Sequence, residues 1–245
     1  MTGAEIPLEE TLRFLTRALP AAPLRILEAG AGEGTVALAL AARGYDVTAL
    51  DESGGGAGPA GGPDAGRVRR IEADFLYYDE NEPYDAVIFT HSLHHMAPAE
   101  AALDRARALL KPAGLLIADE HAYDRVNLPT ARWYYDLESV LAAAGMIPPV
   151  EEAEEEGNPL GRWRKAHAHD PPLQTGHAML AAARERFELI SVDEAPYLYR
   201  SLSGRLEAGD RGGRVARRIF ELESRLVRER DLTAAGLRMI GRKES

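Results

Sequence analysis

A glycine turn that starts with an acidic residue is the first group of residues that could do chemistry. Glu28, Gly30, Gly32 and Gly34 alternate with other residues, and the helix-forming stretch 35–43 follows them. Glycines in such a turn allow positive φ angles, and without a Cβ they let a ligand lie against the main chain. A carboxylate at this place suits a positively charged ligand and would repel a pyrophosphate. The pattern predicts a nucleotide-type ligand or, alternatively, a tight strand-to-helix turn that binds nothing.

Two acidic residues farther along the chain favour a nucleoside. The dinucleotide fingerprint Gly-x-Gly-x-x-Gly fits poorly, because Thr35 stands where its third glycine should be. Asp51 lies about 20 residues after the turn, where a carboxylate can accept hydrogen bonds from ribose hydroxyls. Asp74 can accept one from an adenine amino group, although a solvated loop aspartate is an equal alternative. These residues indicate a nucleoside and leave the reaction open.

Three histidines could supply a base. His94, His95 and His121 follow two predicted strands, at the end of the sheet where open parallel sheets bind ligands, and histidine titrates near neutral pH. One of them is a candidate general base, but His94 and His95 could instead orient the loop or contact the cofactor. His167 and His169 have a metal-ligand spacing without a demonstrable third ligand, so we expect no metal site.

Composition excludes several classes of function. The chain of 245 residues has no cysteine, which rules out disulfides, thiolate metal sites and cysteine nucleophiles. A net charge of −10 argues against a nucleic-acid substrate held on a broad basic surface. No apolar run approaches the ~20 residues that span a bilayer, and the first residues lack the regions of a signal peptide. We therefore expect a cytoplasmic protein that acts on a small molecule, with no membrane or nucleic-acid partner.

Alternating strands and helices must position these residues. Apolar residues at helical spacing predict a helix over residues 8–19, and the stretches 99–110 and 215–230 predict two more. Apolar runs predict strands over residues 24–27, 45–50, 68–72, 84–89 and 115–119. Residues 53–66 hold seven glycines and two prolines, so we expect a mobile loop there in place of a crossover helix.

Taken together and in this order, the motifs resemble those of class I S-adenosylmethionine-dependent methyltransferases that act on small molecules. They are Leu-Glu-Ala-Gly-Ala-Gly-Glu-Gly, Asp51, Ala-Asp-Phe, Tyr-Asp-Ala-Val-Ile-Phe-Thr-His-Ser-Leu-His-His-Met and Leu-Leu-Lys-Pro-Ala-Gly-Leu-Leu-Ile-Ala-Asp-Glu. The match is close over residues 24–120. Two departures are the glycine-rich tract after Asp51 and Ala113, which occupies a position where the family often has glycine.

The resemblance implies an α/β fold: a Rossmann-like, doubly wound sheet of seven strands, mostly parallel with an antiparallel last strand. Residues 187–192 and 236–240 fit its last two strands. It implies a single methyltransferase domain over residues 1–245, in which residues 121–186 form a lid or substrate-specificity insertion of helices and loops. It also implies S-adenosylmethionine as cofactor, with Glu28 as the partner of its methionine part, directly or through water. The residues expected to bind the cofactor are Glu28, Gly30, Gly32, Gly34, Asp51, Glu52, Asp74, Phe75, Thr90 and His91.

Methyl transfer to an oxygen, nitrogen or activated carbon is thus the predicted reaction. It is an in-line displacement at an activated carbon, so the protein mainly supplies alignment and exclusion of water, with a base only where the acceptor must lose a proton. Two alternatives are a dinucleotide-dependent oxidoreductase, disfavoured by Thr35 and Glu28, and a non-catalytic protein that retains the nucleoside site.

Overall fold

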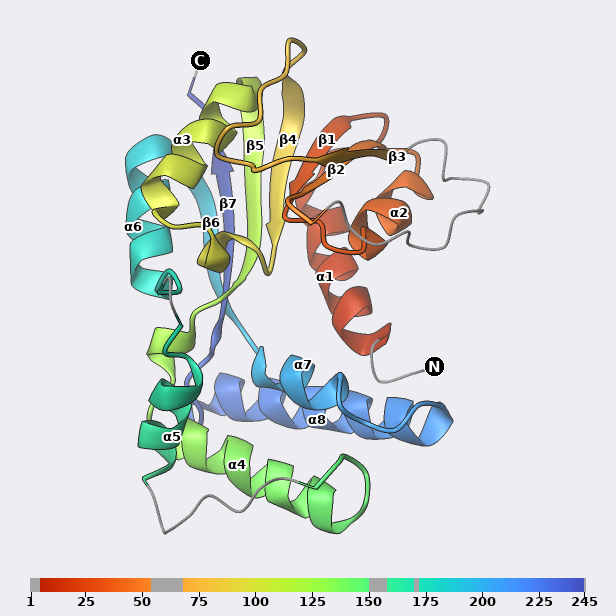
Figure 1. The fold of residues 1–245 in the computed structure, drawn as a ribbon, viewed down its shortest axis with the longest axis vertical. Helices are drawn as coiled ribbons and strands as arrows, with labels where there is room; N and C mark the ends of the chain where they lie inside the picture. Colours follow the sequence, from red (N-terminus) through yellow and green to blue (C-terminus); the bar gives the residue numbers. More distant parts are fainter. Residues whose placement is uncertain (1–4, 54–67, 150–157, 170–171, 245) are drawn as a thin grey trace. The chain divides into compact units, whose positions relative to one another are not determined.

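The computed structural model describes residues 5–53, 68–149, 158–169 and 172–244. Its centre is a seven-stranded sheet with the order β3-β2-β1-β4-β5-β7-β6 (Figure 1). The strands β3, β2, β1, β4 and β5 lie side by side in this order and are all parallel. Strand β7 runs in the opposite direction to β5. This is the predicted Rossmann-like sheet, mostly parallel with an antiparallel last strand. The strands are β1 (Arg25–Ala29), β2 (Asp46–Asp51), β3 (Val68–Glu72), β4 (Tyr84–Thr90), β5 (Leu110–His121), β6 (Glu188–Ala195) and β7 (Gly236–Arg242).

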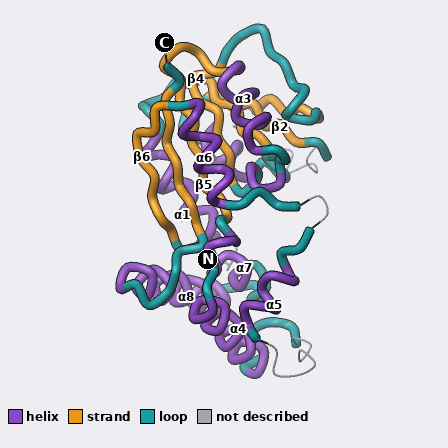
Figure 2. The backbone as a smooth tube through the Cα atoms, turned by 90° about the vertical axis from the view of Figure 1, so that its left-hand side faces the viewer, coloured by secondary structure: helices purple, strands orange, loops and turns teal. Residues whose placement is uncertain are grey.

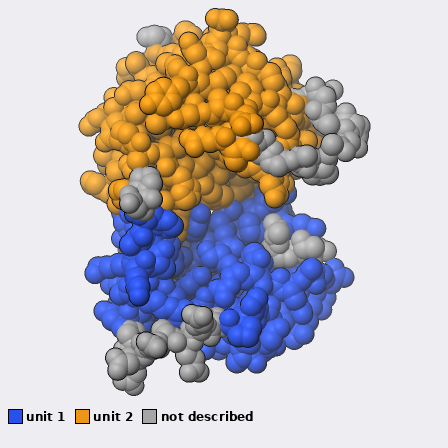
Figure 3. All heavy atoms as spheres, in the orientation of Figure 1, with its two compact units in different colours: residues 1–10, 122–170, 194–236 blue, residues 11–121, 171–193, 237–245 orange. Residues whose placement is uncertain are grey.

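The chain divides into two compact units, which are coloured separately in Figure 3. One unit comprises residues 11–121, 171–193 and 237–245 and carries most of the sheet. In it, α2 (Thr35–Ala41) packs on β2 and β3, while α3 (Ala99–Leu109) packs on β4, β5 and α6 (Gly176–Arg186). Figure 1 shows α2 and α3 on opposite faces of the sheet, and Figure 2 shows α3 and α6 together on one of these faces. Strands β1 and β4 are buried almost throughout, as expected for central parallel strands.

The other unit comprises residues 1–10, 122–170 and 194–236 and is helical over much of its length. In this unit α4 (Leu128–Ala143) packs on α5 (Pro159–Ala166), and α7 (Leu198–Ser203) packs on α8 (Asp210–Glu229). Its buried core includes Tyr134, Trp163 and Tyr199. The remaining elements among the described residues are α1 (Glu5–Ala18), η2 (Leu93–His95) and η3 (Tyr123–Arg125). No helix in the described ranges is long and apolar enough to cross a membrane.

The predicted insertion, residues 121–186, is divided between the two units, because residues 171–186 belong to the unit with the sheet. Its assignment as a lid, and that of residues 1–245 as one domain, stay predictions. The glycine-rich tract lies outside the described residues, except for Ser53.

Strand β5 differs most from the prediction, which began it at Leu115 and ended the preceding helix with a turn. The strand begins at Leu110, and its pairing with β4 jumps from Tyr84 with Leu110 to Ala86 with Leu115. The intervening residues form a bulge, in which Ala113 has a φ of 61°. The family's preference for glycine at this position has a physical reason, because a left-handed backbone angle is unfavourable for a residue with a Cβ.

Two helices also begin earlier in the sequence than predicted. α1 begins at Glu5, three residues before the prediction, and α8 begins at Asp210, five residues before it. The glycines Gly212 and Gly213 at the start of α8 are both buried. Local propensity disfavours glycine in a helix, but packing in this unit overrides it.

Candidate functional site

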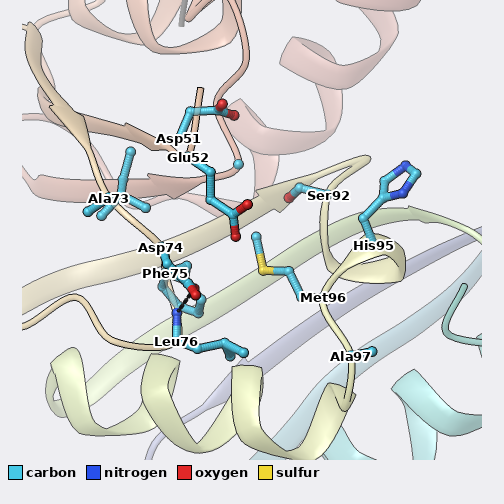
Figure 4. A pocket seen from close by; sticks show the side chains of 12 residues that line it. Asp51, Glu52, Ala73, Asp74, Phe75, Leu76, Ser92, His95, Met96 and Ala97 are labelled. Carbon is cyan, nitrogen blue, oxygen red and sulfur yellow. Dashed lines mark hydrogen bonds between the residues drawn. The ribbon is translucent and has the colours of Figure 1, made fainter. Parts of the chain in front are cut away.

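The carboxyl ends of the parallel strands bring the predicted polar residues to one edge of the sheet. Register pairs Ala29 with Leu50, Ala29 with Phe89, and Asp51 with Glu72, so β1 to β4 end side by side. A cavity of about 420 Å³ lies at this edge (Figure 4). It is lined by Gly30, Leu50, Asp51, Glu52, Ala73, Asp74, Phe75, Leu76, Ser92, His95, Met96 and Ala97.

The glycine turn after β1 has the backbone that its sequence predicts. Gly30, Gly32 and Gly34 have φ angles of 71°, 52° and 73°. The Gly30 N–H donates a 2.8 Å hydrogen bond to the Leu50 carbonyl, which ties the turn to β2. At Gly30 a Cβ would come within 2.5 Å of the Ser92 Cβ, whereas at Gly32 it would meet nothing within 4 Å. Close packing therefore explains the first glycine, and backbone conformation alone explains the second.

Asp51, the residue predicted to bind the ribose, lines the cavity, and its role stays a prediction. Its Oδ2 accepts a 2.8 Å hydrogen bond from the Gly32 N–H, and its Oδ1 accepts hydrogen bonds from the N–H and hydroxyl of Ser53 at 3.0 and 2.5 Å. Burial raises the pKa of Asp51, but the hydrogen bonds from Ser53 and Gly32 outweigh it and keep the pKa below its ordinary value. The group is thus an ionised acceptor at neutral pH.

Asp74 and Phe75 also line the cavity, in the turn after β3. The Leu76 N–H donates a 2.8 Å hydrogen bond to Asp74 Oδ1, the dashed line in Figure 4. Phe75 is almost fully buried and makes an edge-to-face contact with Phe89, with ring centroids 5.3 Å apart. These contacts hold an aromatic ring and a carboxylate at one wall of the cavity, a combination suited to a flat, nitrogen-rich ring.

Glu28 lies at the end of β1, behind the glycine turn, and does not line the cavity. It is 1% exposed, and its Oε1 accepts a 2.7 Å hydrogen bond from the Thr90 hydroxyl. Burial raises the pKa of Glu28 to about 7, although the Thr90 hydroxyl, the Ala37 N–H and the charge of Arg70 lower it. Its Oε2 makes no hydrogen bond of normal geometry with the described residues. A buried acceptor of this kind fits a cationic or hydrogen-bond-donating ligand group.

Five of the predicted cofactor residues line the cavity: Gly30, Asp51, Glu52, Asp74 and Phe75. The other five do not: Glu28, Gly32, Gly34, Thr90 and His91. Thr90 contacts Glu28 instead, and His91 takes a left-handed turn with a φ of 60° while its N–H donates to the Asp119 carbonyl at 3.0 Å. Their roles in binding stay predictions.

Sequence reasoning missed Ser92 and Met96, which line the cavity from the segment after β4. Ser92 also donates a 2.6 Å hydrogen bond from its hydroxyl to the Ala29 carbonyl at the start of the glycine turn. The available signal was their place in the same loop as the histidines, directly after a strand that ends at the ligand edge.

The three predicted catalytic histidines lie together. The ring of His94 is 4.2 Å from that of His95 and 5.9 Å from that of His121, measured between centroids. His95 is exposed and lines the cavity, whereas His94 and His121 are buried. His94 Nδ1 lies 2.6 Å from an oxygen of Glu120, a residue that sequence reasoning did not select.

The histidines considered as metal ligands lie elsewhere. His167 stacks on Tyr123, and its Nδ1 is 2.8 Å from the Trp163 carbonyl oxygen. Within the described ranges no group of three or more histidine, cysteine, aspartate or glutamate side chains could hold a metal ion. Asp170, which follows His169 in the sequence, lies outside the described residues.

Among sequence relatives, the chain is 34% identical over 140 residues to a demethylmenaquinone methyltransferase of Clavibacter sepedonicus, covering 55% of this chain and 56% of the relative. It is 31% identical over 119 residues to a ubiquinone biosynthesis O-methyltransferase of Xylella fastidiosa, covering 43% of this chain and 45% of the relative. The chain thus spans about half the length of these curated relatives.

Solved structures share the fold. A crystal structure of an S-adenosylmethionine-dependent methyltransferase from Mesorhizobium loti aligns with a TM-score of 0.58 at 17% identity, covering 94% of this chain and 95% of that one. In addition, residues 5–153, more than half of the chain, match the family model described as a methyltransferase domain. The chain therefore belongs to this methyltransferase domain family.

Proposed function

We propose that the protein transfers a methyl group from S-adenosylmethionine to a small-molecule acceptor and that the cavity beside the glycine turn holds the cofactor. The observation that carries this proposal is the charge of the cavity wall. Asp51, Glu52 and Asp74 line it, and none of its described lining residues is lysine or arginine. Carboxylates attract a cation and repel a pyrophosphate at close range, which favours this cofactor over a dinucleotide.

Each part of the cofactor has a suitable partner. Asp51 would accept hydrogen bonds from the ribose hydroxyls, and Asp74 with Phe75 would contact the adenine. Glu28 would bind the charged amino group of the methionine part, directly or through water, by its Oε2. When bound, the cofactor supplies an activated methyl group to the acceptor. The protein's own residues then have to orient the two reactants and keep water out.

The acceptor is proposed to be a small molecule that loses a proton from oxygen. One relative is named as an O-methyltransferase of ubiquinone biosynthesis and another as a demethylmenaquinone methyltransferase, so hydroxylated quinone-type rings are the first compounds to test. In addition, residues 121–186 are proposed to contribute to the choice of the acceptor.

A histidine is proposed as the general base that removes this proton. Support comes from the contact of His94 with His95 and His121, beside a cavity that His95 itself lines. Replacing each histidine with Ala should lower turnover and spare affinity for the cofactor. Lost cofactor binding with normal turnover at saturation would contradict the assignment as a base.

Calorimetry with S-adenosylmethionine, S-adenosylhomocysteine and NAD tests the cofactor assignment. We expect binding of the first two and none of NAD; the reverse result would favour the oxidoreductase alternative. Formation of S-adenosylhomocysteine in the presence of hydroxylated quinones or a metabolite extract tests catalysis. Cofactor binding without any such product would favour the non-catalytic alternative.

A further inference from the structure

The carboxylate of Glu120, near the end of β5, is fully buried. Its hydrogen-bond donors come from the segment after β4. Its Oε1 accepts hydrogen bonds from the N–H groups of Ser92 and Leu93 at 3.1 and 2.9 Å. Its Oε2 lies 2.6 Å from His94 Nδ1 and accepts a longer bond of 3.4 Å from the His94 N–H. One side chain therefore fixes both the turn that carries the histidines and the ring of one of them.

Burial of a charge is costly unless hydrogen bonds compensate for it. Burial raises the pKa of Glu120, but the hydrogen bonds from His94 and from the Leu93 N–H outweigh it and lower the pKa below its ordinary value. An ionised carboxylate can only accept hydrogen bonds. The proton between the two side chains therefore belongs to His94 Nδ1.

We propose that Glu120 is a positioning residue that holds the His94 ring by its Nδ1–H, so that Nε2 is the basic nitrogen of the neutral ring. A neutral imidazole has one N–H and one acceptor nitrogen, so the partner of one nitrogen decides the role of the other. Held in this way, His94 can take a proton at Nε2 from an acceptor, and the imidazolium then has a buried counter-ion. The inference depends on the proposed base chemistry for its purpose, but the tautomer itself can be measured without any turnover.

Glu120→Gln is a sharp test, because the amide has one acceptor oxygen and one donor group. Keeping the two hydrogen bonds from Ser92 and Leu93 places the oxygen on their side and the NH₂ against His94 Nδ1. The opposite orientation would break two buried backbone hydrogen bonds in order to keep one with the ring. The ring nitrogen Nδ1 must then accept, and the proton moves to Nε2.

Long-range ¹H–¹⁵N spectra of the full chain, recorded at increasing pH until the His94 ring is neutral, report which ring nitrogen is protonated, and the His94 signals are those lost in His94→Asn. We expect Nδ1–H in the wild type and Nε2–H in Glu120→Gln. Asp119→Asn is the matched control: it alters the neighbouring buried carboxylate, whose partners include Thr11 and Arg238, and should leave the His94 tautomer unchanged. A wild-type Nε2–H form, or no change in Glu120→Gln, would overturn the proposal. If Glu120→Gln does not fold, the wild-type spectrum alone decides.

Turnover supplies the second readout once an acceptor is known. In Glu120→Gln we expect kcat to fall at least about a hundredfold, because the basic nitrogen is protonated in the wrong place. The Kd of S-adenosylhomocysteine should stay within about threefold, since a tautomer change leaves the cofactor cavity intact. A purely structural role would weaken both together, and an unchanged kcat would overturn the positioning role. If the tautomers are as expected but the wild type shows no turnover, the result would instead count against the proposed function.

Discussion

Replacing Glu28 with Gln should make the cofactor-free protein more stable at alkaline pH. Glu28 is 1% exposed, and burial raises its pKa to about 7 from an ordinary value of 4.5. Between these values the folded protein holds a proton that the unfolded chain releases, so raising the pH favours unfolding. At ~1.36 kcal/mol for each unit of pKa, the cost reaches about 3 kcal/mol above pH 7 and is under about 1 kcal/mol at pH 5. Gln stays neutral, can keep the hydrogen bond from Thr90 and avoids this cost.

Urea unfolding of the wild type and of Glu28→Gln, measured in parallel from pH 5 to pH 8, tests this prediction. The difference between their free energies of unfolding isolates Glu28, because the other titrating groups are common to both. We expect that difference to grow with pH to about 3 kcal/mol in favour of the variant. Glu33→Gln, an exposed change in the same turn, should show no such trend. A difference that stays constant across the range would refute the reasoning.

Three further predictions concern other parts of the chain. Gly30→Ala should lower the free energy of unfolding by about 2–4 kcal/mol in thermal or urea unfolding, because a Cβ at a φ of 71° meets Ser92 at 2.5 Å. Gly32→Ala should lower it by only about 1 kcal/mol, and equal losses in the two variants would contradict the packing argument. Asp51→Asn should weaken S-adenosylmethionine about tenfold or more in calorimetry through loss of an ionised acceptor, and unchanged affinity would remove Asp51 from the ribose site. Glu223→Gln should destabilise the protein by about 2 kcal/mol in urea, because its carboxylate accepts three backbone N–H groups at 2.7–2.9 Å and an amide would place a donor against one of them; an unchanged midpoint would contradict this account.

Much of the sheet could be predicted because its strands are short apolar runs bounded by turn residues. β3 has the predicted bounds, and β4 extends the prediction by one residue. β5 was predicted too short because Lys111, Pro112 and Gly114 are local turn signals. Pairing with β4 and a bulge at this point keep them within the strand. Sequence patterns do not reveal such a bulge, because it depends on the neighbouring strand.

The candidate site was predictable where a single segment forms it and less so where segments far apart meet. The φ angles of the glycine turn and the place of Asp51 at the cavity follow from one strand-turn-helix unit. Glu120 was not identified, because it meets His94 through the alignment of β4 with β5, across 26 residues of sequence. Glu28 was identified, but its burial behind the turn, which sets its pKa, depends on packing that spacing does not specify.

A crystal structure of the protein with S-adenosylhomocysteine would test the central claim most directly. We predict density for the ligand in the cavity at the ends of β1 to β4, with the ribose hydroxyls on Asp51, the adenine beside Asp74 and Phe75, and the amino group directed toward Glu28. A ligand bound at another place, or in this cavity without contact to Asp51, would contradict the assignment of this cavity as the cofactor site.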